Sequence, residues 1–407
     1  MGSSIDNTHV PARFHPARHQ VLVLGIAQLW NALDLAWHSH LRLDPRELKG
    51  LKGMAKDRGL VLIVNHADET DVKVCLEVAR LSRCRFTYMV NSEAFEEWHG
   101  FAGWFLERMG GFSVERGGND QTAMRYAVDV VRQGQGALVL FPEGEISYLN
   151  DLMQPFKAGA VHAGLQAIAE TRVTYPAWTA YLVAVIIKYR YCRPIGAVLK
   201  KKISAIERRL QIHANLFTFQ EKIIGIMSKL LKLPRPESAD AMTGAHLAQL
   251  KEEVRQAQTA LLTKIETKYP QFEAIPAAEL VKRARKIMSF LRDRLVQKKL
   301  FTPGTRQQLQ QDIKDIRTTI QMASWQPQYI DLTPSEERLA ETVMKLERQV
   351  FMIKRPPALG RRDIFVRFIT PLDLGCYAEA YRKDPHAVSL QVSEELRGRM
   401  QAMINTM

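Results

Sequence analysis

Short apolar runs alternate with helical patterns between residues 59 and 191. The runs are LVLIV at 60–64, RFTYMV at 85–90, ALVLF at 137–141 and YLVAVIIKY at 181–189. Helical spacing lies between them at 71–82, 94–109, 120–133 and 157–170. Near-continuous apolar runs are typical of parallel strands that are covered on both faces. The pattern therefore predicts an α/β fold with a mostly parallel sheet flanked by helices.

The strand pattern almost disappears from residue 197 to about residue 355. Helical spacing with many Lys and Arg side chains replaces it, and strand character returns at 364–369. We therefore predict one α/β domain, formed by residues 49–197 and 364–407, with a large basic helical insertion at 198–363 before the last strand. Residues 198–364 hold 31 Lys and Arg against 18 Asp and Glu, which is nearly all of the chain's net charge of +14.

Residues 1–48 form a separate N-terminal helical segment in this interpretation. Its apolar stretch at 20–37 contains Asp34, and a carboxylate at the centre of a bilayer costs roughly 3 kcal/mol on insertion scales. A membrane-spanning helix is therefore disfavoured. Two alternatives stay open, a core helix and a membrane-docking helix in the interface with Trp30 and Trp37 as anchors.

Overall composition is that of a folded globular protein, with 46 % hydrophobic and 25 % charged residues. The four cysteines form no CxxC pair, so we expect neither disulfides nor a metal site. The first twenty residues lack the apolar core of a signal peptide, and we expect a cytoplasmic location.

A polar cluster, NHADETD, follows the first apolar run at residues 65–71. His66 stands at the end of the predicted strand and Asp71 in the first turn of the next helix, with Asp68 or Thr70 as its cap. The carboxyl ends of strands are where sites form in open α/β sheets. A carboxylate beside an imidazole fixes its tautomer, as a general base requires. Taken alone, the cluster is explained better as a helix cap that orders the loop than as a catalytic pair.

Three further blocks follow in order. GGFSVERGG at 110–118 offers glycines for close backbone approach and Arg116 for an anion. FPEGEIS at 141–147 again follows a strand end, and PFKAGA at 155–160 places Lys157 at a helix start, where phosphate can bind.

This ordered set resembles the glycerolipid acyltransferase family, over about residues 50–190 and more weakly at 370–373. The resemblance implies that His66, held by Asp71, removes the proton from an acceptor hydroxyl that attacks a fatty acyl thioester. It implies a substrate-binding set of Asn65, Gly110, Arg116, Glu143, Gly144 and Lys157. It further implies no cofactor, with acyl-coenzyme A or acyl carrier protein as acyl donor and 1-acyl-glycerol-3-phosphate as the foremost acceptor, in phospholipid biosynthesis.

The chain departs from the family pattern at several positions. Glu145 and Ile146 stand where the family usually has a Thr-Arg pair, and Ala184 stands where it usually has a proline. In the second block, the family's Ile-Asp-Arg is replaced by Val-Glu-Arg. An acceptor without phosphate therefore stays an alternative. A protein of another class, a non-enzymatic binder of membrane or nucleic acid with a decayed core, is a second alternative. A hydrolase is disfavoured because the chain has no Gly-x-Ser-x-Gly elbow.

The partners expected besides the substrates depend on the basic insertion. Its Lys and Arg side chains favour an anionic membrane surface, which places the protein peripherally on the cytoplasmic face of a membrane, and nucleic acid is not expected. An apolar stripe beside a basic flank adds to this expectation. Its members are Val281, Ala284, Met288, Leu291 and Leu295.

Overall fold

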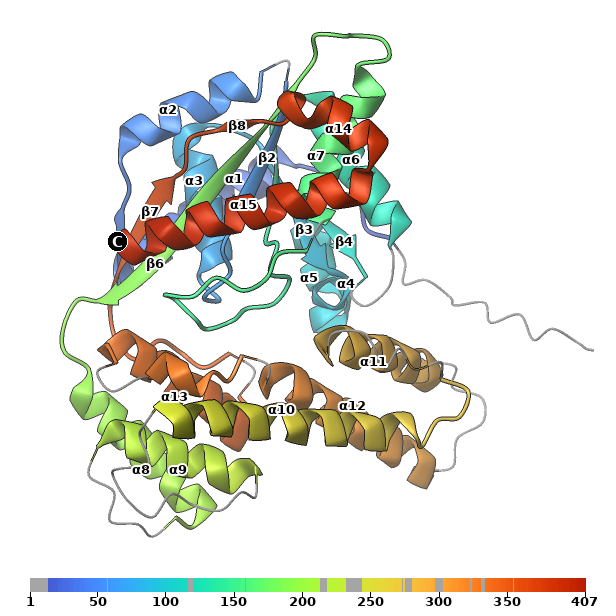
Figure 1. The fold of residues 1–407 in the computed structure, drawn as a ribbon. Helices are drawn as coiled ribbons and strands as arrows, with labels where there is room; N and C mark the ends of the chain where they lie inside the picture. The colour runs from blue at the N-terminus through green and yellow to red at the C-terminus, as the bar shows by residue number, and fades with distance from the viewer. Residues whose placement is uncertain are drawn as a thin grey trace, which may run out of the picture.

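The computed structural model describes residues 14–407 except 57, 116–119, 158, 213–217, 232–243, 273, 275–279, 297–302, 323, 331–333 and 354. An eight-stranded sheet forms its centre, in the order β1-β7-β6-β2-β5-β3-β4, with β8 paired to β6 (Figure 1). The strands are β1 (Ser39–Arg42), β2 (Gly59–Val64), β3 (Phe86–Asn91), β4 (Gly111–Val114), β5 (Ala137–Leu140), β6 (Ala180–Tyr191), β7 (Arg362–Phe368) and β8 (Leu372–Asp373).

Five adjacent strands, β6, β2, β5, β3 and the edge strand β4, all run parallel. β7 and β8 run antiparallel to β6, and β1 runs parallel to β7. The predicted α/β class is thereby confirmed. The five predicted strands correspond to β2, β3, β5, β6 and β7, whereas β1, β4 and β8 were not predicted. The last strand is β8, so the insertion precedes two strands rather than one.

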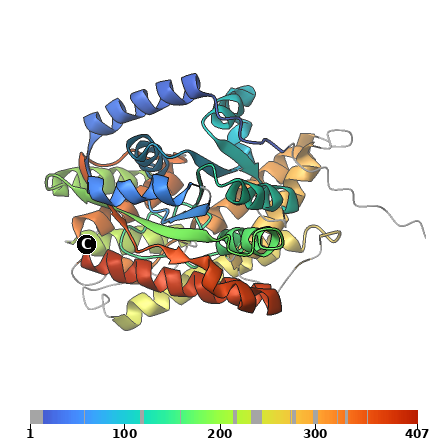
Figure 2. The ribbon, with the colours of Figure 1, turned by 90° about the horizontal axis from the view of Figure 1, so that it is seen from above.

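Helices cover both faces of the sheet, which explains why all six residues of β2 are buried. Val61 and Ile63 face a core formed with α6 (Gln121–Gln133), α7 (Gly159–Thr171), α14 (Ala378–Lys383) and α15 (Pro385–Thr406). Leu60, Leu62 and Val64 face a second core with α1 (Val21–His38), α2 (Pro45–Met54) and α3 (Asp71–Ser82). Figure 2 shows these two layers from above. Alternate residues of one strand therefore hold together two hydrophobic cores.

The prediction of a single helix at 94–109 is wrong. The segment forms α4 (Ser92–Phe95), a 3₁₀ turn η1 (Glu97–Gly100) and α5 (Phe101–Arg108). Trp98, His99 and Gly100 all have positive φ, which no continuous right-handed helix accommodates. The helical spacing of apolar residues was present, but the backbone turns at this point.

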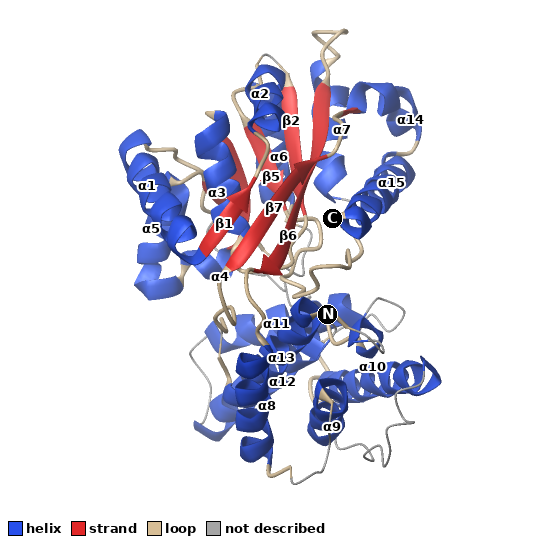
Figure 3. Ribbon diagram, turned by 90° about the vertical axis from the view of Figure 1, so that its left-hand side faces the viewer, coloured by secondary structure: helices blue, strands red, loops and turns tan. Residues whose placement is uncertain are grey.

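The chain between β6 and β7 contains α8 (Gly196–Leu210), α9 (Phe219–Leu231), α10 (Gly244–Glu266), α11 (Leu280–Val296), α12 (Pro303–Met322), η3 (Pro327–Ile330) and α13 (Glu336–Phe351). These helices lie together beyond one edge of the sheet (Figure 1, Figure 3). We call them the helical insertion. Two hydrophobic clusters hold it, one around α8, α9 and α13 and another around α10, α11 and α12.

The apolar stripe of α11 does not face solvent. Ala284, Met288 and Leu291 are buried in the cluster with Leu262 and Ile316, and Leu295 packs against it. These four side chains are therefore part of a protein core, and the stripe does not support a membrane contact. An apolar stripe beside a basic flank fits a helix in a bundle as well as a helix in a bilayer surface. None of the described helices has the length and apolarity needed to cross a bilayer.

Candidate active site

His66 and Asp71 meet where β2 ends and α3 begins. The Nδ1 atom of His66 lies 3.0 Å from Oδ2 of Asp71, and Asp71 is completely buried. The intervening loop lets the two side chains meet, although five residues on one helix would separate them. This is the arrangement expected from the sequence, with the imidazole at the carboxyl end of a parallel strand.

The Asp71 carboxylate accepts two further hydrogen bonds. The hydroxyl of Tyr189 donates to Oδ1 at 2.5 Å, and the backbone N–H of Asp68 donates to Oδ2 at 2.8 Å. Burial raises the pKa of Asp71, and the hydrogen bond with His66 opposes that rise. Because Nδ1 of His66 faces the carboxylate, we assign its hydrogen to Nδ1, which leaves Nε2 as the basic atom.

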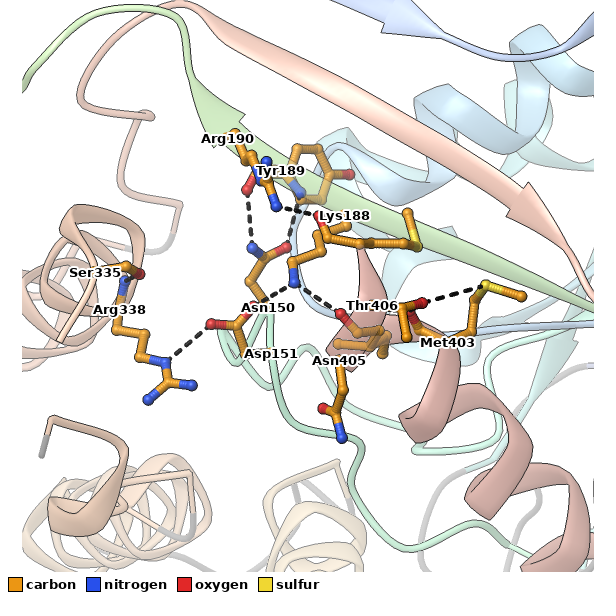
Figure 4. A network of polar contacts seen from close by, with 12 residues as sticks. Asn150, Asp151, Lys188, Tyr189, Arg190, Ser335, Arg338, Met403, Asn405 and Thr406 are labelled. Carbon is orange, nitrogen blue, oxygen red and sulfur yellow. Dashed lines mark hydrogen bonds and ion pairs between the residues drawn. The ribbon is translucent and has the colours of Figure 1, made fainter.

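Tyr189 is a residue of the site that the sequence analysis missed. It belongs to β6, 118 residues from Asp71, and a tyrosine in an apolar strand gives no signal of its function. Asn150 fixes it, because its side-chain amide donates to the carbonyl of Tyr189 at 2.9 Å and accepts from its N–H at 2.8 Å (Figure 4). The neighbouring Asp151 binds Lys188 of β6 and Arg338 of α13. The helical insertion therefore contributes to holding Tyr189 in place.

Arg362, the first residue of β7, was also missed. Its guanidinium binds both carboxylate oxygens of Asp68, at 2.8 and 3.0 Å, and donates to Oγ1 of Thr70. Burial opposes ionisation of Asp68 most strongly, yet the charge and hydrogen bonds of Arg362 outweigh it and lower the pKa of Asp68 to about 2. The pair fixes the His66–Asp71 loop against β7. Oδ1 of Asp68 also accepts the backbone N–H of Thr70 at 2.9 Å, directly before α3, so Asp68 both orders the start of this helix and belongs to a buried ion pair.

The Glu143 side chain binds the backbone of His66. Its Oε1 accepts the N–H of His66 at 2.9 Å, while Oε2 has no hydrogen-bond partner within the described chain. Burial raises the pKa of Glu143 to about 7. The Phe141 ring stacks on the His66 imidazole with centroids 4.2 Å apart. The third block therefore positions the imidazole from two sides.

Gly144 and Lys157 are neighbours in the structure. Gly144 has a φ of +74°, and a Cβ atom there would collide with the end of the Lys157 side chain. Lys157 is exposed, its N–H donates to the carbonyl of Pro142 at 2.9 Å, and α7 begins two residues later. The third and fourth blocks thus come together beside His66, and a cation lies at this point.

The other predicted binding residues have different positions. Both polar atoms of the Asn65 amide bind the backbone of Ile187, so Asn65 joins β2 to β6, and its contact with substrate stays a prediction. Gly110 precedes β4, at the opposite end of that strand from Val114. Its φ is +97°, and it lies against His19 and the carbonyl of Phe86. The structure does not bring Gly110 to His66, and Arg116 lies outside the described residues.

The two residues that depart from the family pattern both contact the helical insertion. Glu145 Oε1 accepts a hydrogen bond from Nη2 of Arg285 on α11 at 3.0 Å. Ile146 packs against the cluster formed by α8, α9 and α13. The Ser147 N–H donates to the carbonyl of His66 at 2.9 Å. The replacements therefore join the loop beside His66 to a part of the chain outside the four blocks.

One group of side chains in the described part of the chain has the composition of a metal site. It consists of His40, Cys192 and Asp363, at the β1–β7 edge of the sheet. Oδ1 of Asp363 already accepts a hydrogen bond from the guanidinium of Arg42 at 3.0 Å, which competes with a cation. We assign no metal to this group.

Comparison with known proteins agrees with this geometry. Residues 46–188 match a family model described as acyltransferase. That range includes His66, Asp71, Glu143, Gly144 and Lys157, and it ends within β6 before Tyr189 and Arg362. A comparison with curated proteins gave no significant match. The match supports an acyltransferase function for this part of the chain.

The raised pKa of Glu143 makes the stability of the protein depend on pH. The carboxyl loses its proton near pH 4.5 in the unfolded chain and near pH 7 in the folded protein. Its contribution is thus most favourable below pH 4.5 and is lost as pH rises through 7. Glu143→Gln keeps an oxygen acceptor for the His66 N–H but has no proton to lose. We expect the free energy of unfolding of Glu143→Gln, relative to that of wild type, to be roughly 2 to 3 kcal/mol higher at pH 8 than at pH 5.

Denaturant unfolding at the two pH values measures this difference. Glu379→Gln on the exposed surface of α14 is the control, for which we expect a much smaller change with pH. An equal free-energy difference between Glu143→Gln and wild type at pH 5 and pH 8 would contradict the assignment.

Proposed function

We propose that the protein transfers a fatty acyl group from an acyl thioester to a hydroxyl of a glycerolipid precursor, foremost 1-acyl-glycerol-3-phosphate, in phospholipid biosynthesis. The observation that carries the proposal is the His66–Asp71 pair, 3.0 Å apart, inside the region that matches the acyltransferase model. The finer choice of substrate rests on the resemblance of the four blocks and on the cations beside His66.

In the proposed reaction, Nε2 of His66 removes the proton of the acceptor hydroxyl. The acceptor oxygen then forms a bond with the thioester carbonyl carbon, the carbon–sulfur bond breaks, and the proton passes to the leaving thiolate. Asp71 stabilises the imidazolium that forms between these steps. General-base help contributes about 10²- to 10⁴-fold in rate, so positioning of both substrates must supply much of the rest. No covalent acyl-enzyme is required.

Acyl-coenzyme A or acyl carrier protein is the proposed donor, and both carry phosphate. The helical insertion, with its excess of Lys and Arg, is the proposed contact for these acidic donors and for anionic lipid. The Lys157 side chain lies against Gly144 of the third block, and this cation supports an acceptor that carries phosphate.

We expect purified protein to make the diacyl product from acyl-coenzyme A or acyl carrier protein and lysophosphatidic acid. His66→Ala removes the base and should lower product formation by about 10²- to 10⁴-fold. Lipid analysis by mass spectrometry measures the products over a panel of acceptors, including monoacylglycerol. His386→Ala, an exposed histidine on α15, is the control and should keep wild-type activity. Full activity in His66→Ala, with an unchanged melting temperature, would refute the mechanism.

We further propose that the protein acts peripherally on the cytoplasmic face of a membrane, with α1 as its docking helix. α1 packs Ala27, Asn31 and Leu35 onto the body and exposes its opposite face. Trp30 and Trp37 are 74 % and 80 % exposed. The other exposed apolar side chains of this face are Val21, Leu22, Ile26, Leu29 and Leu33, and α5 beside it adds Phe101 and Trp104 (Figure 3).

A continuous apolar helix face that carries tryptophans is typical of helices that lie in a bilayer interface. This supports α1 as the docking helix suggested by the sequence, in place of the buried stripe of α11. The contact would be largely hydrophobic and would therefore persist in salt.

We expect the variant with both Trp30→Ala and Trp37→Ala to bind anionic lipid vesicles about thirtyfold more weakly than wild type or worse, because each buried side chain contributes on the order of 1 to 2 kcal/mol. Sedimentation with vesicles in low and high salt measures the bound fraction. Tyr175→Ala, an exposed aromatic residue in the loop after α7, is the control. Wild-type binding by the double variant would reject α1 as the docking surface.

A further inference from the structure

Arg285 of α11 brings a guanidinium to the loop beside His66, although it lies 140 residues from its partner Glu145 in the sequence. Its side chain is only 11 % exposed. Its Nε atom is buried and has no hydrogen-bond partner among the described residues. A buried donor of a charged group is costly to leave unsatisfied. The pair with Glu145 therefore does not account for the whole guanidinium.

The position of Arg285 relative to His66 follows from the loop of residues 143–147. This loop is bound to the backbone of His66 at both ends, through Glu143 Oε1 and through the N–H of Ser147. Glu145 is its middle residue, so its Cα lies within about 7 Å of the Cα atoms of both ends. The Lys157 side chain covers Gly144, the adjacent residue. Two cations from distant parts of the chain thus meet on five residues that hold the predicted base.

Attachment of the insertion is a weaker explanation for Arg285. α11 is also joined to the body through an ion pair between Arg292, about two turns beyond Arg285, and Glu93 of α4. Arg355 adds contacts to Glu69 and Glu97, and Ile146 packs into an insertion cluster. These contacts secure the insertion without requiring a guanidinium with an unsatisfied buried donor beside the base.

We propose that Arg285 binds a phosphate group carried by a substrate, so that the helical insertion completes the acyltransferase site. The inference rests on the proposed function and specifies it further. A guanidinium presents several N–H donors in one plane, so it can keep its bond to Glu145 and donate to a phosphate oxygen. The chain has Ile146 where the resembling pattern has an arginine, and Arg285 brings that chemical group to the same loop.

Steady-state kinetics of Arg285→Gln test this proposal. We expect KM for one phosphate-bearing substrate to rise roughly tenfold to hundredfold, because a charge-assisted hydrogen bond is lost, with a smaller change in kcat. Varying lysophosphatidic acid at saturating donor, and then acyl-coenzyme A at saturating acceptor, identifies the substrate whose phosphate Arg285 binds. If the acceptor carries it, KM for monoacylglycerol should stay at the wild-type value. Arg285→Lys should restore part of the affinity.

Two matched variants separate phosphate binding from attachment of the insertion. Glu145→Gln breaks the same ion pair but leaves the guanidinium, so KM for the phosphate-bearing substrate should stay the same or fall. Arg292→Gln removes another ion pair between α11 and the body and should leave KM unchanged. Melting temperatures of all variants show whether they are folded. Equal changes in Glu145→Gln and Arg285→Gln, or no change of any KM in Arg285→Gln, would overturn the proposal.

Failure of the proposed function gives a different result. If wild-type protein acylates no acceptor in the panel, the transfer assignment fails before Arg285 is tested. Calorimetric binding of a short-chain lysophosphatidic acid or of coenzyme A to wild type and to Arg285→Gln then tests the phosphate site alone. If Arg285→Gln binds each of the two ligands as tightly as wild type does, the inference is overturned.

Discussion

The structure depends on the burial of one carboxylate, that of Asp71. A charge withdrawn from water requires donors around it, and Asp71 has three, from His66, Tyr189 and the backbone of Asp68. Each donor belongs to a segment that must be in place for the set to form. The strand end supplies the imidazole, the loop supplies the N–H, and β6 supplies the hydroxyl. The site is therefore assembled by the fold as a whole.

Further contacts extend this requirement to distant parts of the chain. Asp68, whose N–H binds Asp71, is itself paired with Arg362 of β7. Tyr189 is held by Asn150, whose N–H binds Glu341 of α13. The helical insertion lies beyond the edge of the sheet where β2 ends, and it touches the loop beside His66 through Glu145 and Ile146 (Figure 3). It is thus connected to the base through several independent contacts.

The sequence predicted the features that depend on local pattern. Strands β2, β3, β5 and β6 lie in nearly continuous apolar runs, and His66 and Asp71 stand close together at the end of one of them. β1, β4 and β8 are short, and Ser, His, Arg, Gly or Asp interrupts each of them, so none gives a continuous apolar run. Tyr189 and Arg362 could not be predicted, because they reach the site across 118 and 294 residues of sequence. The stripe of α11 was misinterpreted because a bundle core and a membrane surface require the same spacing.

The central claim is that Asp71 holds His66 as a general base for acyl transfer. The most direct measurement is kcat/KM for acyl transfer by Asp71→Asn, which keeps the size of the side chain but removes its charge and places an amide beside Nδ1. Asp129→Asn on the surface of α6 is the control. The account predicts a loss of about 10²- to 10⁴-fold in Asp71→Asn alone, with the protein still folded. Activity of folded Asp71→Asn within tenfold of wild type would contradict it.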